Sequence, residues 1–360
     1  MKDILCIGPL PPPITGQSFA FESFIENSKH NITVVNVNLE GKSVLAKVIT
    51  SIGLVFEVLI LLLRNDFHCL YFTSSRSVLG FLLDSIFIMQ FRVFSRKGKV
   101  VNHLHGADFA NLCDKRGMSY LVRSVYNTID ESIVLSKAMT NQYRQFLNMK
   151  TNVVSNFSSS FIDSEKLIEK KREFQRGSEL NILYLSNLMY SKGVLDLVYA
   201  VSSLNEKGYK VNLILAGDFL NDDYMTGNEL KEIVDAKLTG KIRYVGVLTG
   251  SDKEEVLEKS HVFCLPTFYK SEAQPISIIE AMAYSNLVLT TRHNFNEDFL
   301  GEDECVFFEK KNQEALGGVI KDVFDNRGKY QRNIENGYRR AILDFSLSNH
   351  VTSIDKILGD

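Results

Sequence analysis

The sequence predicts an α/β protein built from two doubly wound domains, each with a parallel sheet. Three observations lead to this prediction. The chain has 360 residues, which is long for one hydrophobic core and comfortable for two. Short apolar runs alternate with longer amphipathic segments, the pattern of strand–helix units. This alternation stops at a polar, charged stretch, residues 157–178, and then begins again.

In the first half, short apolar runs predict strands at residues 3–8, 32–37, 69–73, 100–104, 132–136 and 151–156. Amphipathic patterns predict helices from about residue 17 to residue 27 and over residues 137–147. Two further apolar segments, 52–63 and 78–94, fall short of the roughly 18–20 apolar residues that span a bilayer. Residues 52–63 form either a buried helix or a helix lying on a membrane surface, and we expect the buried helix, since no clear polar face is present. Residues 78–94 precede a basic turn, so core packing and contact with a membrane surface both remain open.

The second half repeats the pattern, with predicted strands at residues 180–186, 211–216, 241–246, 262–265, 287–291 and 304–308. Predicted helices cover residues 194–205, 252–259 and 276–283, and amphipathic helices follow to the C-terminus. We therefore place a first domain at residues 1–158, a linker at 159–178 and a second domain at 179–344, with a final helix at 345–360.

The most informative stretch runs from His261 to Ala283. It combines a buried strand, a polar loop with Glu272, and a helix that begins near Pro275 and contains Glu280. A helix N-terminus offers free N–H groups and a partial positive charge, which suit a phosphate group. Carboxylates on either side can accept hydrogen bonds from sugar hydroxyls. This stretch therefore predicts part of a nucleotide-sugar site.

Three further candidates lie in the strand-to-helix connections, and one of them, His105, directly follows a predicted strand, where open α/β sheets bind ligands. Gly16 ends a proline-rich loop, where a glycine lets the backbone approach a phosphate closely. His105 follows the strand at 100–104 and precedes Gly106. Lys192 stands at the start of the helix at 194–205, where its ammonium group can meet a diphosphate. A turn glycine, a capping or core histidine and a surface lysine are the alternative interpretations.

The stretch S-E-A-Q-P-I-S-I-I-E-A-M-A resembles the E-x7-E motif of GT-B fold retaining glycosyltransferases of family 4. The segment S-N-L-M-Y-S-K-G is similar to that family's G-R-L-x-x-x-K-G, although Asn187 stands where the family has a phosphate-binding arginine. The resemblance implies that Glu272 binds the donor sugar and Glu280 the ribose, while His105 orients the sugar. Roles in donor binding are also implied for a further set of residues: Gly16, Asn187, Lys192, Val247 (through its backbone, to the base), Pro275 and Ile276.

The same resemblance implies two Rossmann-like domains that face a central cleft, with the last helix crossing back to the first domain. It implies transfer from a nucleotide diphosphate sugar, UDP-sugars being favoured, with retention at the anomeric carbon and no metal or other cofactor. The P-P-P-x-x-G-Q-S opening looks most like bacterial surface-polysaccharide (O-antigen or capsule) transferases. Such enzymes act on lipid-diphosphate-linked saccharides as peripheral proteins at the cytoplasmic face of the membrane.

The amino-acid composition fits a cytoplasmic transferase that works at a membrane, and the absence of certain motifs counts against other classes of protein. Residues 1–176 carry 21 Lys and Arg against 15 Asp and Glu, so the first half is basic and favours an anionic partner such as a membrane surface. The five cysteines are odd in number and lack C-x-x-C spacing, which is typical of reduced thiols in a cytoplasmic protein. No signal peptide, nucleic-acid motif or metal-ligand cluster is evident. G-x-G-x-x-G is absent, which counts against a dehydrogenase.

Two alternatives stay open. A nucleotide-sugar epimerase of the same fold would need additional carboxylates and histidines, and the sequence does not offer them at recognisable positions. A non-catalytic nucleotide-sugar-binding subunit of a transferase complex would tolerate Asn187 in place of arginine.

Overall fold

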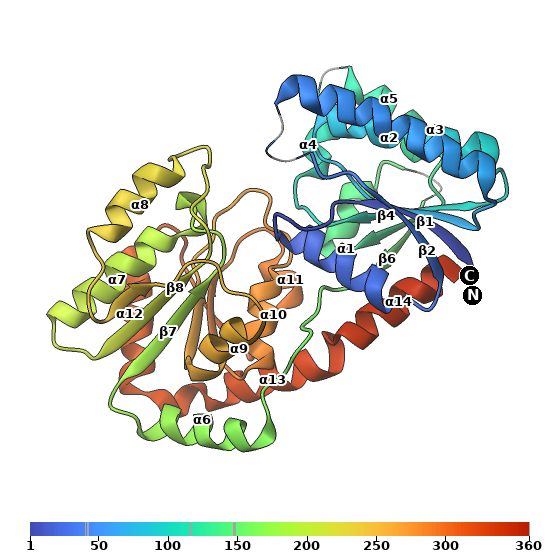
Figure 1. Cartoon of the computed structure of the whole chain (residues 1–360). Helices are drawn as coiled ribbons and strands as arrows, with labels where there is room; N and C mark the ends of the chain where they lie inside the picture. Colours follow the sequence, from blue (N-terminus) through green and yellow to red (C-terminus); the bar gives the residue numbers. More distant parts are fainter. Residues whose placement is uncertain (40, 42, 116, 147–148, 360) are drawn as a thin grey trace. The chain divides into compact units, whose positions relative to one another are not determined.

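The computed structural model describes the whole chain except residues 40, 42, 116, 147–148 and 360. The chain divides into two compact units (Figure 1). Unit 1 comprises Met1–Asn156 together with Leu347–Asp360, and unit 2 comprises Phe157–Ser346. Each unit contains one six-stranded sheet with parallel pairing, which confirms the predicted α/β class with two parallel sheets.

The sheet of unit 1 has the strand order β2-β1-β3-β4-β5-β6. The direction of strand addition reverses between β1 and β3, and ligands of open α/β sheets bind at such a point, beyond the carboxyl ends of the strands. The strands are β1 (Asp3–Gly8), β2 (Asn31–Asn36), β3 (Cys69–Thr73), β4 (Lys99–Leu104), β5 (Glu131–Val134) and β6 (Lys150–Val153).

Helices cover both faces of this sheet. Figure 1 shows α2, α3 and α5 on one side, and α1 and the C-terminal α14 on the other. The described helical elements are α1 (Gly16–Asn27), α2 (Val44–Arg64), α3 (Val78–Phe94), α4 (Phe109–Cys113), α5 (Met118–Tyr126), the 3₁₀ helix η1 (Ala138–Tyr143) and α14 (Leu347–Gly359).

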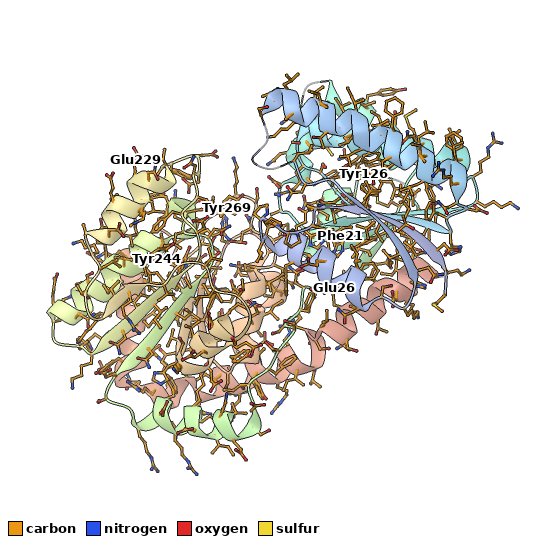
Figure 2. The ribbon with its side chains drawn as sticks, viewed as in Figure 1. Phe21, Glu26, Tyr126, Glu229, Tyr244 and Tyr269 are labelled. Carbon is orange, nitrogen blue, oxygen red and sulfur yellow. The ribbon has the colours of Figure 1, made fainter. Side chains whose placement is uncertain are left out.

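Aromatic side chains fill both layers of unit 1. On one side, Phe21 of α1 stacks on Tyr71 of β3, with ring centroids 6.1 Å apart. On the other side, Tyr126 of α5 packs on Phe109 at 4.8 Å. Both labelled residues, Phe21 and Tyr126, can be followed in Figure 2. This burial fixes β3 and β4, the strands that lead into the loops with Arg76 and His105.

The sheet of unit 2 has the order β12-β11-β10-β7-β8-β9, which is the order of a dinucleotide-binding sheet, with its switch point between β7 and β10. The strands are β7 (Leu180–Leu185), β8 (Val211–Ala216), β9 (Ile242–Tyr244), β10 (Val262–Leu265), β11 (Leu287–Thr291) and β12 (Cys305–Phe308). The apolar core of unit 2 spans all six strands.

The helical elements of unit 2 are α6 (Ser164–Arg176), η2 (Tyr190–Lys192), α7 (Val194–Glu206), α8 (Gly227–Asp235), α9 (Gly250–Lys259), α10 (Ile276–Ala283), α11 (Asn296–Phe299), α12 (Gln313–Asp325), η3 (Arg327–Tyr330) and α13 (Gln331–Asp344). The expected linker at 159–178 thus contains a helix, α6. Its Phe174 is buried in the core of unit 2, and its buried Lys170 donates to two backbone carbonyls there. The two units divide between Asn156 and Phe157.

Two expectations for unit 1 differ from the structure. Residues 52–63, expected to be a buried helix, are part of the longer α2, most of whose apolar side chains are exposed. The expectation was wrong because α2 is apolar on both faces, so a missing polar face does not indicate burial. The helix expected at 137–147 is a 3₁₀ helix at Ala138–Tyr143, and Leu147 lies outside the described residues. The five cysteines are free and buried.

Candidate active site

Two loops leave the sheet of unit 2 at its switch point, where β7 and β10 pair side by side. The loop after β7 contains Asn187 and Lys192, and the loop after β10 contains Glu272 and Pro275. Because neighbouring parallel strands end at the same edge of a sheet, residues separated by 80 positions meet here. Four of the predicted site residues therefore share one edge of unit 2.

Lys192 and Glu272 form a nearly buried ion pair at this edge. The Lys192 Nζ lies 3.2 Å from the Glu272 Oε2, and the side chains are 13% and 9% exposed. Lys192 also donates to the Ser186 Oγ at 2.9 Å, and Thr267 donates to the same Glu272 oxygen at 3.2 Å. The ring of Tyr269, labelled in Figure 2, lies with its centroid 5.7 Å from the ammonium. The four contacts fix both charged groups.

The approach of the two loops depends on Gly193. Its φ is +73°, in the left-handed region, and a Cβ atom there would lie 2.2 Å from the carbonyl oxygen of Pro266. Only glycine fits both the conformation and the close contact. Gly193 thus lets α7 begin directly against the loop that carries Glu272.

Asn294 is one of the residues that hold the loop with Glu272. The Asn294 side chain donates to the backbone carbonyls of Lys270 at 3.0 Å and Glu272 at 2.9 Å. Asn294 has a φ of +47°, which asparagine tolerates better than most residues. Neither Asn294 nor Thr267 is predicted from the sequence, because Asn294 acts on residues at least 22 positions away and Thr267, five positions before Glu272, matches no local motif.

The helix α10 begins directly after Pro275, whose backbone is extended. Since proline has no side-chain acceptor, residue 275 cannot cap the first N–H groups of the helix. The N-terminus of α10 therefore retains the donor groups and partial positive charge that suit an anion. Ile276 is the first residue of the helix, as predicted.

Glu280 lies in the same helix and is buried, with 6% of its surface exposed. Burial raises the pKa of its carboxyl group, and the nearby Lys253 ammonium partly opposes this shift. The Lys253 Nζ lies 2.6 Å from the Glu280 Oε1. Lys253 belongs to α9 and is not predicted as a site residue from the sequence, because α9 has the pattern of an ordinary surface helix with charged residues.

The loops after β7, β8 and β9 are joined through Gly217. Its N–H donates to the carbonyl of Gly246 at 2.8 Å, and its carbonyl accepts from the Tyr244 hydroxyl at 3.0 Å. A Cβ on Gly217 would lie 2.0 Å from the carbonyl oxygen of Ser186. Val247 follows Gly246 and is 59% exposed. Asn187 is half-buried, and its carbonyl accepts from the Tyr184 hydroxyl at 2.9 Å.

In unit 1, His105 follows β4 and its imidazole is neutral at ordinary pH. Burial lowers the pKa of His105 to about 3, with smaller contributions from His350 and Arg76. Its ring lies 4.0 Å from that of His103, which shares a 2.8 Å hydrogen bond with the Tyr71 hydroxyl. Within the described part of the chain, neither ring nitrogen of His105 has a hydrogen-bond partner. Both nitrogens are buried, so their hydrogen-bonding capacity is unsatisfied inside unit 1.

Arg76 lies beside His105 and was not singled out in the sequence. Its Nη1 donates to the Asp108 carboxylate at 2.7 Å, and a Cβ on Gly106 would lie 2.4 Å from the same nitrogen. The glycine after His105 thus makes room for a guanidinium group. After β1, which pairs with β3, Gly16 is the first residue of α1, and Thr15 caps that helix by accepting from the Ser18 N–H.

Across residues 1–360 without the six undescribed positions, no group of three or more His, Cys, Asp and Glu is placed to hold a metal ion. The described part of the chain contains one helix, α2, that is long and apolar enough to cross a membrane, and a single helix of this kind is weak evidence by itself.

Comparison with solved structures defines the class of fold. The chain matches Anabaena Alr3699/HepE in complex with UDP-glucose, with a TM-score of 0.73 at 15% identity and full coverage of both chains. It matches sucrose-phosphate synthase from Thermosynechococcus elongatus with a TM-score of 0.74 at 12% identity, over 99% and 98% of the two chains. The lipopolysaccharide outer core galactosyltransferase WaaB matches with a TM-score of 0.62 at 15% identity, over 99% and 100%. The fold is therefore GT-B.

Sequence comparison finds similarities that lie mainly in unit 2. Residues 165–340 match the model for glycosyl transferases group 1. One subunit of the human phosphatidylinositol N-acetylglucosaminyltransferase is 26% identical over 151 residues, and the Mycobacterium tuberculosis glycogen synthase is 21% identical over 182 residues. These matches cover 42% and 51% of this chain, and 30% and 43% of those relatives. Together they support a glycosyltransferase with a GT-B fold.

Proposed function

We propose that this chain is a retaining glycosyltransferase that transfers a sugar from a nucleotide diphosphate sugar, with UDP as the favoured nucleotide. The observation that carries the proposal is the Lys192–Glu272 pair at the switch point of unit 2, 3.2 Å from Nζ to Oε2. It stands beside the N-terminus of α10, which residue 275 leaves uncapped. The site therefore offers both signs of charge within a few ångströms.

Sugar transfer requires both positive and negative groups in the active site. When the bond between the sugar and the diphosphate breaks, negative charge develops on the leaving group and positive charge on the sugar ring. Lys192 and the α10 N-terminus would stabilise the diphosphate, and Glu272 would bind the donor sugar and stabilise its ring. Since these groups are already fixed by Ser186 and Thr267, they need little reorganisation as the charge develops.

The remaining candidates would take further parts in donor binding. Glu280 would bind the ribose hydroxyls, and the backbone at Val247 would meet the base. His105 would orient the donor sugar as a neutral imidazole, since burial holds its pKa at about 3. Gly16 would let the backbone approach the diphosphate.

We further propose a lipid-diphosphate-linked saccharide as acceptor, at the cytoplasmic face of the membrane, in the assembly of a surface polysaccharide such as lipopolysaccharide or capsule. The basic first half of the chain supports an anionic, membrane-bound acceptor. Two similar proteins point the same way, since one belongs to a phosphatidylinositol N-acetylglucosaminyltransferase and the other is a lipopolysaccharide galactosyltransferase.

The test is a transfer assay with the full chain, a panel of UDP-, GDP- and dTDP-sugars, and saccharide acceptors on diphosphate lipids. We expect transfer from a UDP-sugar, and NMR of the product should show the same anomeric configuration as the donor. An inverted product would disprove the retaining mechanism. Donor turnover without any acceptor product would disprove the proposed transferase activity.

One alternative has a specific observation in its favour. Asn187 stands where the G-R-L-x-x-x-K-G pattern has an arginine, so one positive charge is missing. The charge of Lys192 is already paired with that of Glu272. A non-catalytic subunit that only binds nucleotide sugars would tolerate both features. It would bind UDP-sugars as tightly as a transferase does, but no acceptor in the panel would receive sugar.

A further inference from the structure

The outer face of α2 is covered by exposed apolar side chains. Leu54, Val58 and Leu62, spaced four residues apart, are buried and hold the helix on unit 1. The exposed apolar residues of the helix are Val44, Leu45, Val48, Ile49, Ile52, Phe56, Ile60 and Leu63, and five of them are 59–80% exposed. A soluble helix normally places polar residues there. This face therefore needs a partner or an apolar environment.

The neighbouring helix α3 carries a second apolar stripe. Its exposed residues Leu79, Leu82, Ile86, Met89 and Val93 follow a regular three–four spacing, while Phe81, Ile88 and Phe91 are buried. The Gln90 side chain of α3 donates to the carbonyl of Val55 in α2 at 3.1 Å, and Figure 1 shows the two helices side by side over one face of the sheet. We name these thirteen exposed residues the α2–α3 surface.

Charge around this surface is positive. Residues 43–99 carry seven Lys and Arg against three Asp and Glu. Lys47, Arg64, Arg96 and Lys97 are exposed, and three of these four stand at or just after the C-terminal ends of the two helices. One of the three carboxylates, Asp84, is buried and accepts from Ser75. The exposed apolar face is thus flanked mainly by cations.

We propose that the α2–α3 surface embeds in the interfacial layer of a lipid bilayer that contains anionic lipids. Apolar side chains suit hydrocarbon, and none of the thirteen residues is a Tyr, Trp or Arg, the residues that stable protein interfaces concentrate. The flanking cations suit anionic headgroups. The buried stripe of Leu54, Val58 and Leu62 keeps α2 on unit 1, so the helix lies along the membrane rather than across it.

This inference builds on the proposed function, since a lipid-linked acceptor requires the protein to work at a membrane, but its test does not require catalysis. The full chain is mixed with phosphatidylcholine vesicles, with and without phosphatidylglycerol, and bound protein is measured by cosedimentation. The variant I49S/F56S/L63S removes three exposed apolar side chains of α2. The matched control V153S/I168S/L343S removes three that are similarly exposed elsewhere.

We expect binding to the anionic vesicles, and a loss of roughly ten-fold or more in the α2 variant but not in the control, because each buried apolar side chain contributes more than a factor of ten. R96E/K97E should weaken binding to anionic vesicles only, and K207E/K210E, an exposed pair in unit 2, should not. Equal binding by the wild type and both triple variants would overturn the inference.

Light scattering separates the lipid from a second copy of the chain. A wild-type dimer that I49S/F56S/L63S converts to a monomer, with vesicle binding unchanged, would overturn the inference in favour of self-association. UDP binding, measured in parallel on every variant, is expected to stay unchanged. Vesicle binding without UDP binding would support the proposed membrane surface and contradict the proposed transferase function.

Discussion

Lys192 and Glu272 lie 80 positions apart in the chain, yet the Lys192 Nζ stands 3.2 Å from the Glu272 Oε2. The pairing of β7 with β10 brings the two loops together, and Gly193 allows the final approach. A largely buried ion pair is often no more stabilising than apolar residues of the same size. Its position at a switch point therefore argues for a function, and its two members can be tested separately.

Lys192→Ala should weaken UDP-sugar binding roughly ten-fold and lower kcat/KM roughly a hundred-fold or more, because the leaving diphosphate loses its cation. Calorimetry and initial rates measure the two effects. Lys270→Ala is the control, since Lys270 pairs with Asp223 on the exposed surface of the neighbouring loop. Equal losses in both variants would mean that the charge of Lys192 has no special role.

Glu272→Gln should separate binding from chemistry. The amide keeps the size of the side chain and can still accept from Thr267, but the negative charge is lost. Since Lys192 is then unopposed, UDP should bind as tightly as before or more tightly, while kcat falls roughly a hundred-fold. A variant with unchanged kcat would show that Glu272 takes no part in the reaction.

Gly193→Ala should destabilise unit 2 by about 2–4 kcal/mol, because the new Cβ would meet the Pro266 carbonyl and the left-handed backbone adds strain. Gly208→Ala provides a matched control. Gly208 has a φ of +89° but nothing within 4 Å of its Cβ position, so only the backbone cost of about 1 kcal/mol applies. Urea unfolding gives both values, and equal values would show that the close contact is relieved without cost.

His350 should make the folded state sensitive to acid. Burial lowers its pKa from 6.5 to about 4, so the unfolded chain takes up a proton at higher pH than the folded one. The stability from this residue is complete above pH 6.5 and is lost as the pH falls towards 4. Between pH 7.5 and pH 5 the loss from His350 should be about 2 kcal/mol.

His350→Gln isolates this contribution. Glutamine can replace the imidazole as donor to the carbonyl of Ser155, at 2.7 Å in the wild type, but it does not titrate. The pH dependence of unfolding should therefore be shallower in the variant, although His103 and His105 still contribute because burial lowers their pKa values too. Identical slopes for the two proteins would contradict the assignment.

The sequence predicted the β10–α10 region to the residue, because a four-residue apolar run, a proline and a helical repeat are all local signals. It also placed Lys192 and Glu272 in loops after strands, but not in contact, since their pairing depends on the order of strands in the sheet. Asn294 and Lys253 were missed because their contacts also join distant parts of the chain, and Thr267 was missed because it matches no motif. The exposure of α2 was missed because a helix that is apolar on both faces carries no sign of which face is buried.

Asn187→Arg tests whether the departure from the G-R-L-x-x-x-K-G pattern weakens the site. Asn187 is half-buried in the same loop as Lys192, so a guanidinium group there adds a second cation near the diphosphate. We expect UDP to bind roughly ten-fold more tightly at low salt, with the gain shrinking as salt is added. In the Lys192→Ala background the same change should restore part of the lost binding. Asn187→Gln, which adds length without charge, is the control, and an equal gain in that variant would show that charge at position 187 is irrelevant.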